Sequence, residues 1–210
     1  MDADTFRERV ETAKATELDR LGSQQALVAL TDAQLDRERV LRAVAQSEHV
    51  ARETFAGWAE DEDDPDASEA FADLAERERD HYERVVAELD GEFEPTDAVD
   101  SMHDHLRGLD DAVARSAGLV GRSLASDKTQ LQVVNFFVNE ADERRADLFR
   151  DLRADTQDEA DEGVRLLAET CEGDDDWERA RDVAVETVQI AYEDYAETLD
   201  GMGLDPKPIC

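Results

Sequence analysis

Two stretches of the sequence place carboxylate and imidazole side chains within the apolar face of an amphipathic helix. In residues 41–59 apolar side chains recur at a spacing of three and four, and Glu48 lies at the centre of that face. In residues 71–89 both Glu78 and His81 fall within the apolar stripe. A charged group that points into a core is costly unless it is paired or ligates a cation. The pattern predicts half of the ligand set of a two-metal site in a four-helix bundle, with Glu from one helix and Glu-x-x-His from the next.

The ligand atoms of these residues limit which metals the site can bind. Carboxylate oxygens combined with an imidazole nitrogen suit iron or manganese, whereas thiolate-rich sets suit zinc and iron–sulfur clusters. The sequence has two cysteines, Cys171 and Cys210, and they form no Cys-x-x-Cys motif. We therefore expect iron or manganese at the predicted site, and no zinc-ribbon or rubredoxin-type iron centre.

The elements that would position these residues are all helices. Glycine and proline are scarce and lie at boundaries, and no stretch alternates apolar and polar residues with the period of a strand. We predict helices over residues 4–21, 23–31, 32–59, 68–89, 98–126, 129–154, 157–172 and 175–200. The expected fold is a single all-α domain, residues 1–210, with a core bundle at about 32–154 and flanking helices in 4–31 and 157–200.

The second predicted helix pair contains fewer candidate ligands than the first. Helix 98–126 turns valine, leucine, serine and glycine inward, and none of these is a metal ligand. On helix 129–154, Glu140 lies at the edge of the inner face, Glu143 lies further round, and Arg144 projects towards the seam between the pairs. Three interpretations stay open. The inward acids bind metal, or Arg144 neutralises them in a non-catalytic helical protein that acts in assembly or partner binding, or a small-molecule pocket lies between the helices in place of the metal.

A family resemblance rests on the same residues. SEHVARETFAGWA, followed by FADLAERERDHYERVVAEL, resembles the first helix pair of the rubrerythrin-like branch of the ferritin-like superfamily. That branch has Glu-Ser-Gln-Ala-Arg on its first helix and Glu-x-x-Glu-x-x-His on its second. The resemblance covers residues 36–90 well and 98–153 loosely. It implies a ferritin-like four-helix bundle with additional N- and C-terminal helices.

The resemblance also implies a role for each residue that matches the motif. Glu48 would be the terminal ligand of one iron, Glu78 a bridging carboxylate and His81 the imidazole ligand. Glu140 would match the second bridging carboxylate, and Glu143 stands where the family has its second histidine. The implied activity is reduction of peroxide or oxygen in oxidative-stress defence, with a partly eroded di-metal site and an unidentified electron donor. A homodimer in which two chains share the half-site across a twofold axis also stays open.

The net charge of the chain limits the classes of molecule that it can bind. Acidic residues outnumber basic ones 56 to 23, which gives a formal net charge of −33, and only three residues are lysines. Nucleic acid and anionic membrane surfaces would repel such a chain. An acidic sequence poor in lysine resembles the proteins of salt-in halophiles, so we expect the fold to weaken at low salt.

Residues 1–20 contain no hydrophobic segment, and no apolar run approaches the roughly 18 residues of a membrane span. We therefore expect a cytoplasmic protein.

Overall fold

In the computed structural model, which describes residues 2–206, the chain is all-α and contains no strand in that range. The helices of the described residues are α1 (Ala3–Ala13), α2 (Ala15–Leu21), α3 (Gln24–Leu30), α4 (Arg37–Asp61), α5 (Pro65–Val86), α6 (Ser101–Arg107), α7 (Ala112–Asn139), α8 (Glu143–Thr170) and α9 (Asp174–Gly201). Among these helices, none combines the length and apolar character that crossing a membrane requires.

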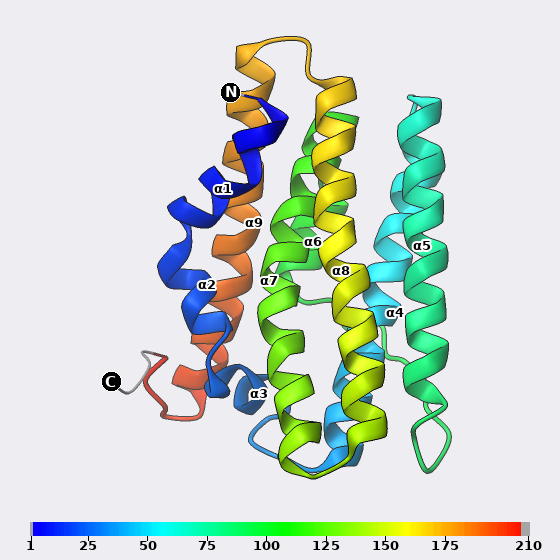
Figure 1. Cartoon of the computed structure of the whole chain (residues 1–210), viewed down its shortest axis with the longest axis vertical. Coiled ribbons are helices and arrows are strands. Elements are labelled where there is room, and N and C mark those ends of the chain that lie inside the picture. The colour runs from blue at the N-terminus through cyan, green and yellow to red at the C-terminus, as the bar shows by residue number, and fades with distance from the viewer. Residues whose placement is uncertain (1, 207–210) are drawn as a thin grey trace.

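The long helices form two antiparallel pairs, α4 with α5 and α7 with α8, whose axes run roughly along one direction (Figure 1). Helix α9 packs against the side of α7, and α1 to α3 lie along α9 and the ends of α7 and α8. Helix α6 lies between α4 and α9. As a result, α7 is the central helix of the molecule, and the seam between the two pairs is lined by α4, α5, α7 and α8.

Aspartate side chains fix the starts of the paired helices. Asp36, Asp64, Asp111 and Asp142 each accept a hydrogen bond from a backbone N–H in the first turn of the helix that follows. An aspartate at this position satisfies a free backbone donor and complements the helix dipole. At the turn between α7 and α8, Ala141 adopts a positive φ of 56°. The turn is therefore built without glycine or proline.

The structure corrects the predicted boundaries of the second pair. The first pair agrees with the expected helices to within five residues at each end, because an acidic run and Pro65 separate α4 from α5. The expected helices 98–126, 129–154 and 157–172 are wrong. Helix α7 continues through residues 127–128, and α8 continues through 155–156. The paired helices therefore extend from Arg37 to Thr170, beyond the expected end of the core at 154.

Candidate metal centre

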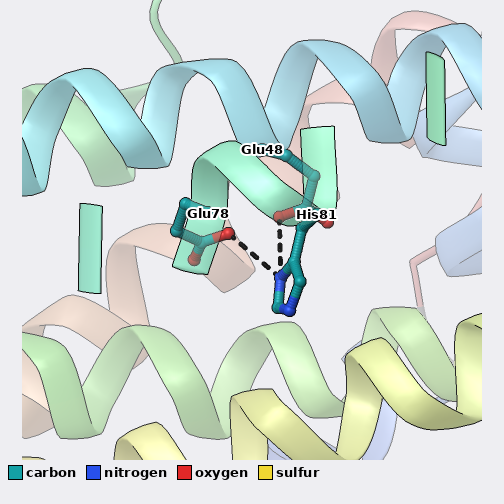
Figure 2. A group of neighbouring side chains, drawn as sticks. All are labelled: Glu48, Glu78 and His81. Atoms are coloured by element: carbon teal, nitrogen blue, oxygen red, sulfur yellow. Dashed lines mark ion pairs between the residues drawn. The ribbon is translucent and has the colours of Figure 1, made fainter. Parts of the chain in front are cut away.

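Glu48, Glu78 and His81 converge in the seam, as their positions on the apolar faces predicted (Figure 2). Glu48 comes from α4 and the other two residues from α5, and all three side chains are buried. The Nδ1 atom of His81 lies 3.4 Å from Glu78 Oε2 and 4.0 Å from Glu48 Oε2. One ligand atom from each residue lies within 4.8 Å of the others. Two carboxylates and one imidazole therefore face a common point.

The orientation of His81 is fixed from the opposite helix pair. Its Nε2 lies 3.0 Å from Oδ2 of Asp155 on α8. When Nε2 donates its proton to Asp155, Nδ1 carries the free lone pair, and that atom points towards the two glutamates. A carboxylate behind a metal-binding histidine sets its tautomer and ring orientation in this way.

A buried arginine provides the fixed positive charge of the seam. The Nη2 atom of Arg122, on α7, lies 2.7 Å from Glu78 Oε1, and its Nη1 donates to Glu159 Oε2 on α8 at 2.7 Å. The guanidinium also lies 5.2 Å from the centre of the Phe55 ring, within the range of a cation–π contact. Arg122 and Glu159 are as fully buried as the predicted ligands. The seam thus brings together three buried glutamates, one buried arginine and one buried histidine among the described residues.

No family model, curated protein or solved structure matches this chain. The resemblance of residues 36–90 to rubrerythrin-like proteins consequently rests on the motif residues alone.

The carboxylates of the centre outnumber its one fixed positive charge, which is that of Arg122. Burial, and then the charge of Glu78, raise the pKa of Glu48 well above its usual value. Burial also raises the pKa of Glu78, but Arg122 and His81 outweigh it and hold that pKa far below its usual range. Burial and Glu78 raise the pKa of Glu159 to about 7, although Arg122 opposes them. Burial lowers the pKa of His81, but the contact with Glu78 outweighs it and the net change is upward. Protons or a metal ion must supply the missing positive charge.

Three buried side-chain atoms of the centre also lack hydrogen-bond partners among the described residues. These atoms are Glu78 Oε2, His81 Nδ1 and Glu159 Oε1. A buried polar atom without a partner costs about 1–3 kcal/mol. Because two of these atoms belong to the predicted ligands and face one another, the residues present fit a single metal ion.

The remaining predicted site residues lie elsewhere. Glu140 is the C-cap residue that follows α7, Glu143 is the first residue of α8, and both are exposed at the turn between these helices. The side chain of Arg144 is 66% exposed and pairs with Glu88. The structure brings none of them into the seam, because the chain turns where a continuous helix was expected. The expectation that Arg144 neutralises the inward acids is wrong, and Arg122 does so instead.

One of the missed residues carried a visible signal. Glu159 lies seven residues from Leu152 and from Leu166, which is the spacing that separates Glu48 from Leu41 and Phe55. All of these flanking residues are buried. The predicted break between residues 154 and 157 divided this pattern and concealed it.

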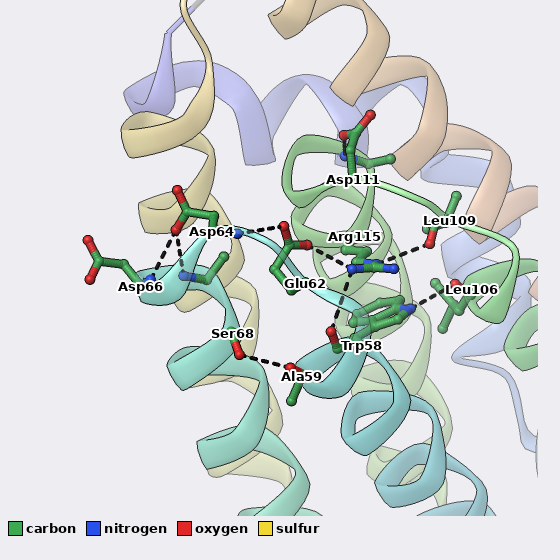
Figure 3. Close-up of polar contacts among 12 residues, drawn as sticks. Trp58, Ala59, Glu62, Asp64, Asp66, Ser68, Leu106, Leu109, Asp111 and Arg115 are labelled. Carbon is green, nitrogen blue, oxygen red and sulfur yellow. Dashed lines mark hydrogen bonds and ion pairs between the residues drawn. The ribbon is translucent and has the colours of Figure 1, made fainter.

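A second buried ion pair lies two turns before Arg122 on the same helix, and it has a structural role (Figure 3). Arg115 pairs with Glu62 at 2.8 Å, and the two side chains are 7% and 6% exposed. Arg115 also donates to the carbonyl oxygens of Leu109 and Trp58. The Trp58 indole N–H donates in turn to the carbonyl oxygen of Leu106. These bonds join the carboxyl end of α4 to α6 and to the start of α7.

Proposed function

We propose that the protein is a ferritin-like, rubrerythrin-like metalloprotein that binds one iron or manganese ion between Glu48, Glu78 and His81. The observation that carries this proposal is the convergence of three buried ligand atoms within 4.8 Å. The orientation of His81 by Asp155 and the surplus of carboxylates in the seam support it. A divalent ion would neutralise two carboxylates that are otherwise expensive to bury as ions.

An iron ion bound here would supply electron transfer for the reduction of peroxide or oxygen. The protein side chains have separate tasks in this proposal. Glu48 and Glu78 would hold the ion through carboxylate oxygens, and His81 would hold it through its imidazole. The apolar residues that flank Glu48, including Leu41 and Phe55, exclude water from the seam. The carboxylate of Asp155 is 41% exposed, so its contact with His81 links the buried centre to solvent.

The first experiment is a metal-binding measurement in high-salt buffer, where weak binding to surface acids is suppressed. The apoprotein is titrated with Fe²⁺ under anaerobic conditions, or with Mn²⁺, then desalted and analysed for metal per chain. We expect one ion per chain in the wild type and none in a Glu78→Ala, His81→Ala double variant.

A matched control distinguishes the centre from the acidic surface. Glu53→Gln removes an exposed carboxylate from α4, one that pairs with its neighbour Arg52. This variant should retain the metal. Equal uptake by the wild type and the double variant would disprove the proposed site. If uptake is confirmed, the rate at which peroxide or oxygen oxidises the Fe²⁺-loaded protein tests the redox activity.

The contacts of Arg122 favour a second candidate function. Its guanidinium already pairs with Glu78 and Glu159, so the buried acids have a partner without any metal. In that case the protein is a non-catalytic helical scaffold that acts in assembly or partner binding. Absence of metal uptake by folded wild-type protein would support this candidate over the first.

A further inference from the structure

We propose that Arg122 is a built-in cation that takes the place of a second metal ion, so that the centre holds one ion and excludes a second. This inference rests on the proposed function for the first ion. It also assigns a role to a residue that no metal-ligand pattern identifies. In this proposal the side chain of Arg122 sets the number of metal ions that each chain binds.

The contacts of Arg122 are those of a bridging cation. It joins one carboxylate from α5 to one from α8, with nitrogen–oxygen distances of 2.7 Å to both Glu78 and Glu159. The Phe55 ring lies against the guanidinium and limits its movement. Arginine remains protonated in proteins, so this positive charge cannot be lost as a proton. A metal ion at the same point would meet a fixed like charge.

The charged residues that the two helix pairs contribute follow a similar order along the chain. In the first pair, α4 contributes Glu48, and α5 contributes Glu78 and, three residues later, His81. In the second pair, α7 contributes Arg122, and α8 contributes Glu159 and, three residues later, Glu162. Arg122 is thus the buried charged residue that α7 contributes to the seam, as Glu48 is the one that α4 contributes.

The third position of the second pair does not contribute to the seam. The side chain of Glu162 is 31% exposed and forms a salt bridge with Arg165 at 2.6 Å. Of Glu159 and Glu162, Glu159 is the one that enters the seam. One of its carboxylate oxygens already accepts a hydrogen bond from Arg122. The second half of the centre therefore has a cation in place of one ligand and lacks another.

The test replaces this cation with a carboxylate. Wild type, Arg122→Glu, and Arg122→Glu combined with Glu159→Gln are each titrated with Mn²⁺, and metal is counted per chain. Electron paramagnetic resonance separates isolated Mn²⁺ from a magnetically coupled pair. We expect one isolated ion in the wild type, two coupled ions in Arg122→Glu, and a return to one ion in the double variant.

The outcomes separate this inference from the proposed function. If the wild type binds no ion but Arg122→Glu binds two, the proposed function fails and the count of one ion fails with it, while the exclusion of metal by Arg122 stands. Two ions in the wild type, or an Arg122→Glu protein that is folded and binds no more than the wild type, would overturn the inference. Folded proteins that all bind nothing would overturn both.

A second pair of variants applies if Arg122→Glu does not fold. Without metal, Arg122→Met should lower the unfolding midpoint by on the order of 10 °C, since it leaves buried carboxylates unpaired. Adding Glu159→Gln should recover part of that loss, because one of the two carboxylates is then neutral. An unfolding midpoint that is unchanged in Arg122→Met would show that the guanidinium is not the needed cation.

Discussion

Asp155 links a buried histidine to the surface, and its contribution can be measured separately from that of the ligands. It does not face the two glutamates, and its carboxylate contacts the far nitrogen of His81. Losing it would leave the ligand set complete while freeing the imidazole to rotate or change tautomer. Residues that act through a ligand in this way alter metal affinity and leave the number of ions unchanged.

We predict that Asp155→Ala weakens metal binding by about 10–100-fold and leaves the stoichiometry unaltered. Competition with a chelator of known affinity measures this change. Asp151→Ala is the matched control, since Asp151 lies one turn earlier on α8 and forms only an exposed pair with Arg84. Equal losses in the two variants would indicate a general electrostatic effect and no specific support of His81.

The buried pair of Arg115 and Glu62 provides a second test at the scale of single residues. We predict that Arg115→Met lowers the free energy of unfolding by about 3–5 kcal/mol, because the buried carboxylate of Glu62 loses its positive partner and two carbonyl oxygens lose a donor. Denaturant titration in high salt measures this loss. Arg179→Met breaks an exposed pair with Asp111 and should cost less than about 1 kcal/mol. The prediction fails if both variants cost the same.

At the scale of elements, the packing of α9 against α7 depends on one glycine. A Cβ atom at Gly121 would lie 2.6 Å from the carbonyl oxygen of Ala184 and 2.7 Å from Cβ of Thr187, both on α9. Both neighbours belong to, or are attached directly to, the backbone of α9 and cannot rotate away. The two helices are therefore as close as a bare backbone allows.

We predict opposite effects from the same substitution at two glycines in helices. Gly121→Ala should destabilise the fold by about 1–3 kcal/mol, since α7 and α9 must move apart. Gly57→Ala, on α4, should stabilise it by roughly 0.5–1 kcal/mol, because a Cβ there meets no described atom within 4 Å and alanine favours the helix. Unfolding curves of both variants test this. A loss of stability at Gly57, or none at Gly121, would contradict the packing described.

The same elements show which parts of the structure the sequence could predict. Helices α4 and α5 were predictable because acidic residues and Pro65 separate them, and each has one apolar face. The turn between α7 and α8 has neither glycine nor proline, and its positive φ falls on Ala141. The missed turn left Glu140 and Glu143 at the predicted site, and the separate break predicted at 154–157 hid Glu159.

Arg122 could not be predicted for a different reason. Helix α7 packs against α8 on one side and α9 on another, so it is buried around most of its circumference. A helix that is buried on all sides has no single apolar stripe to show which residues face which neighbour. Only the packed structure shows that Arg122 points to the seam between the pairs and that nearby small residues face α9.

At the scale of the whole molecule, charge is the dominant property. The formal net charge is −33 over 210 residues, and many of the arginines already pair with neighbouring acids at the surface. The surplus acids repel one another across the entire surface. The screening length is about 30 Å at 0.01 M salt and about 3 Å at 1 M, so this repulsion is strong in dilute buffer and short-ranged in concentrated salt.

We predict that the thermal unfolding midpoint rises steadily as KCl increases from about 0.01 M to 1 M, because screening removes repulsion that unfolding would otherwise relieve. The turn between α4 and α5 offers a matched variant. Neutralising Glu60, Asp61 and Asp63, all exposed, should raise the midpoint at low salt and flatten its salt dependence. Glu62 and Asp64 stay unchanged in this variant, since Glu62 pairs with Arg115 and Asp64 caps α5.

An unfolding midpoint independent of KCl would mean that surface repulsion does not limit stability. Salt dependence that the triple variant leaves intact would instead place the repulsion in other parts of the surface.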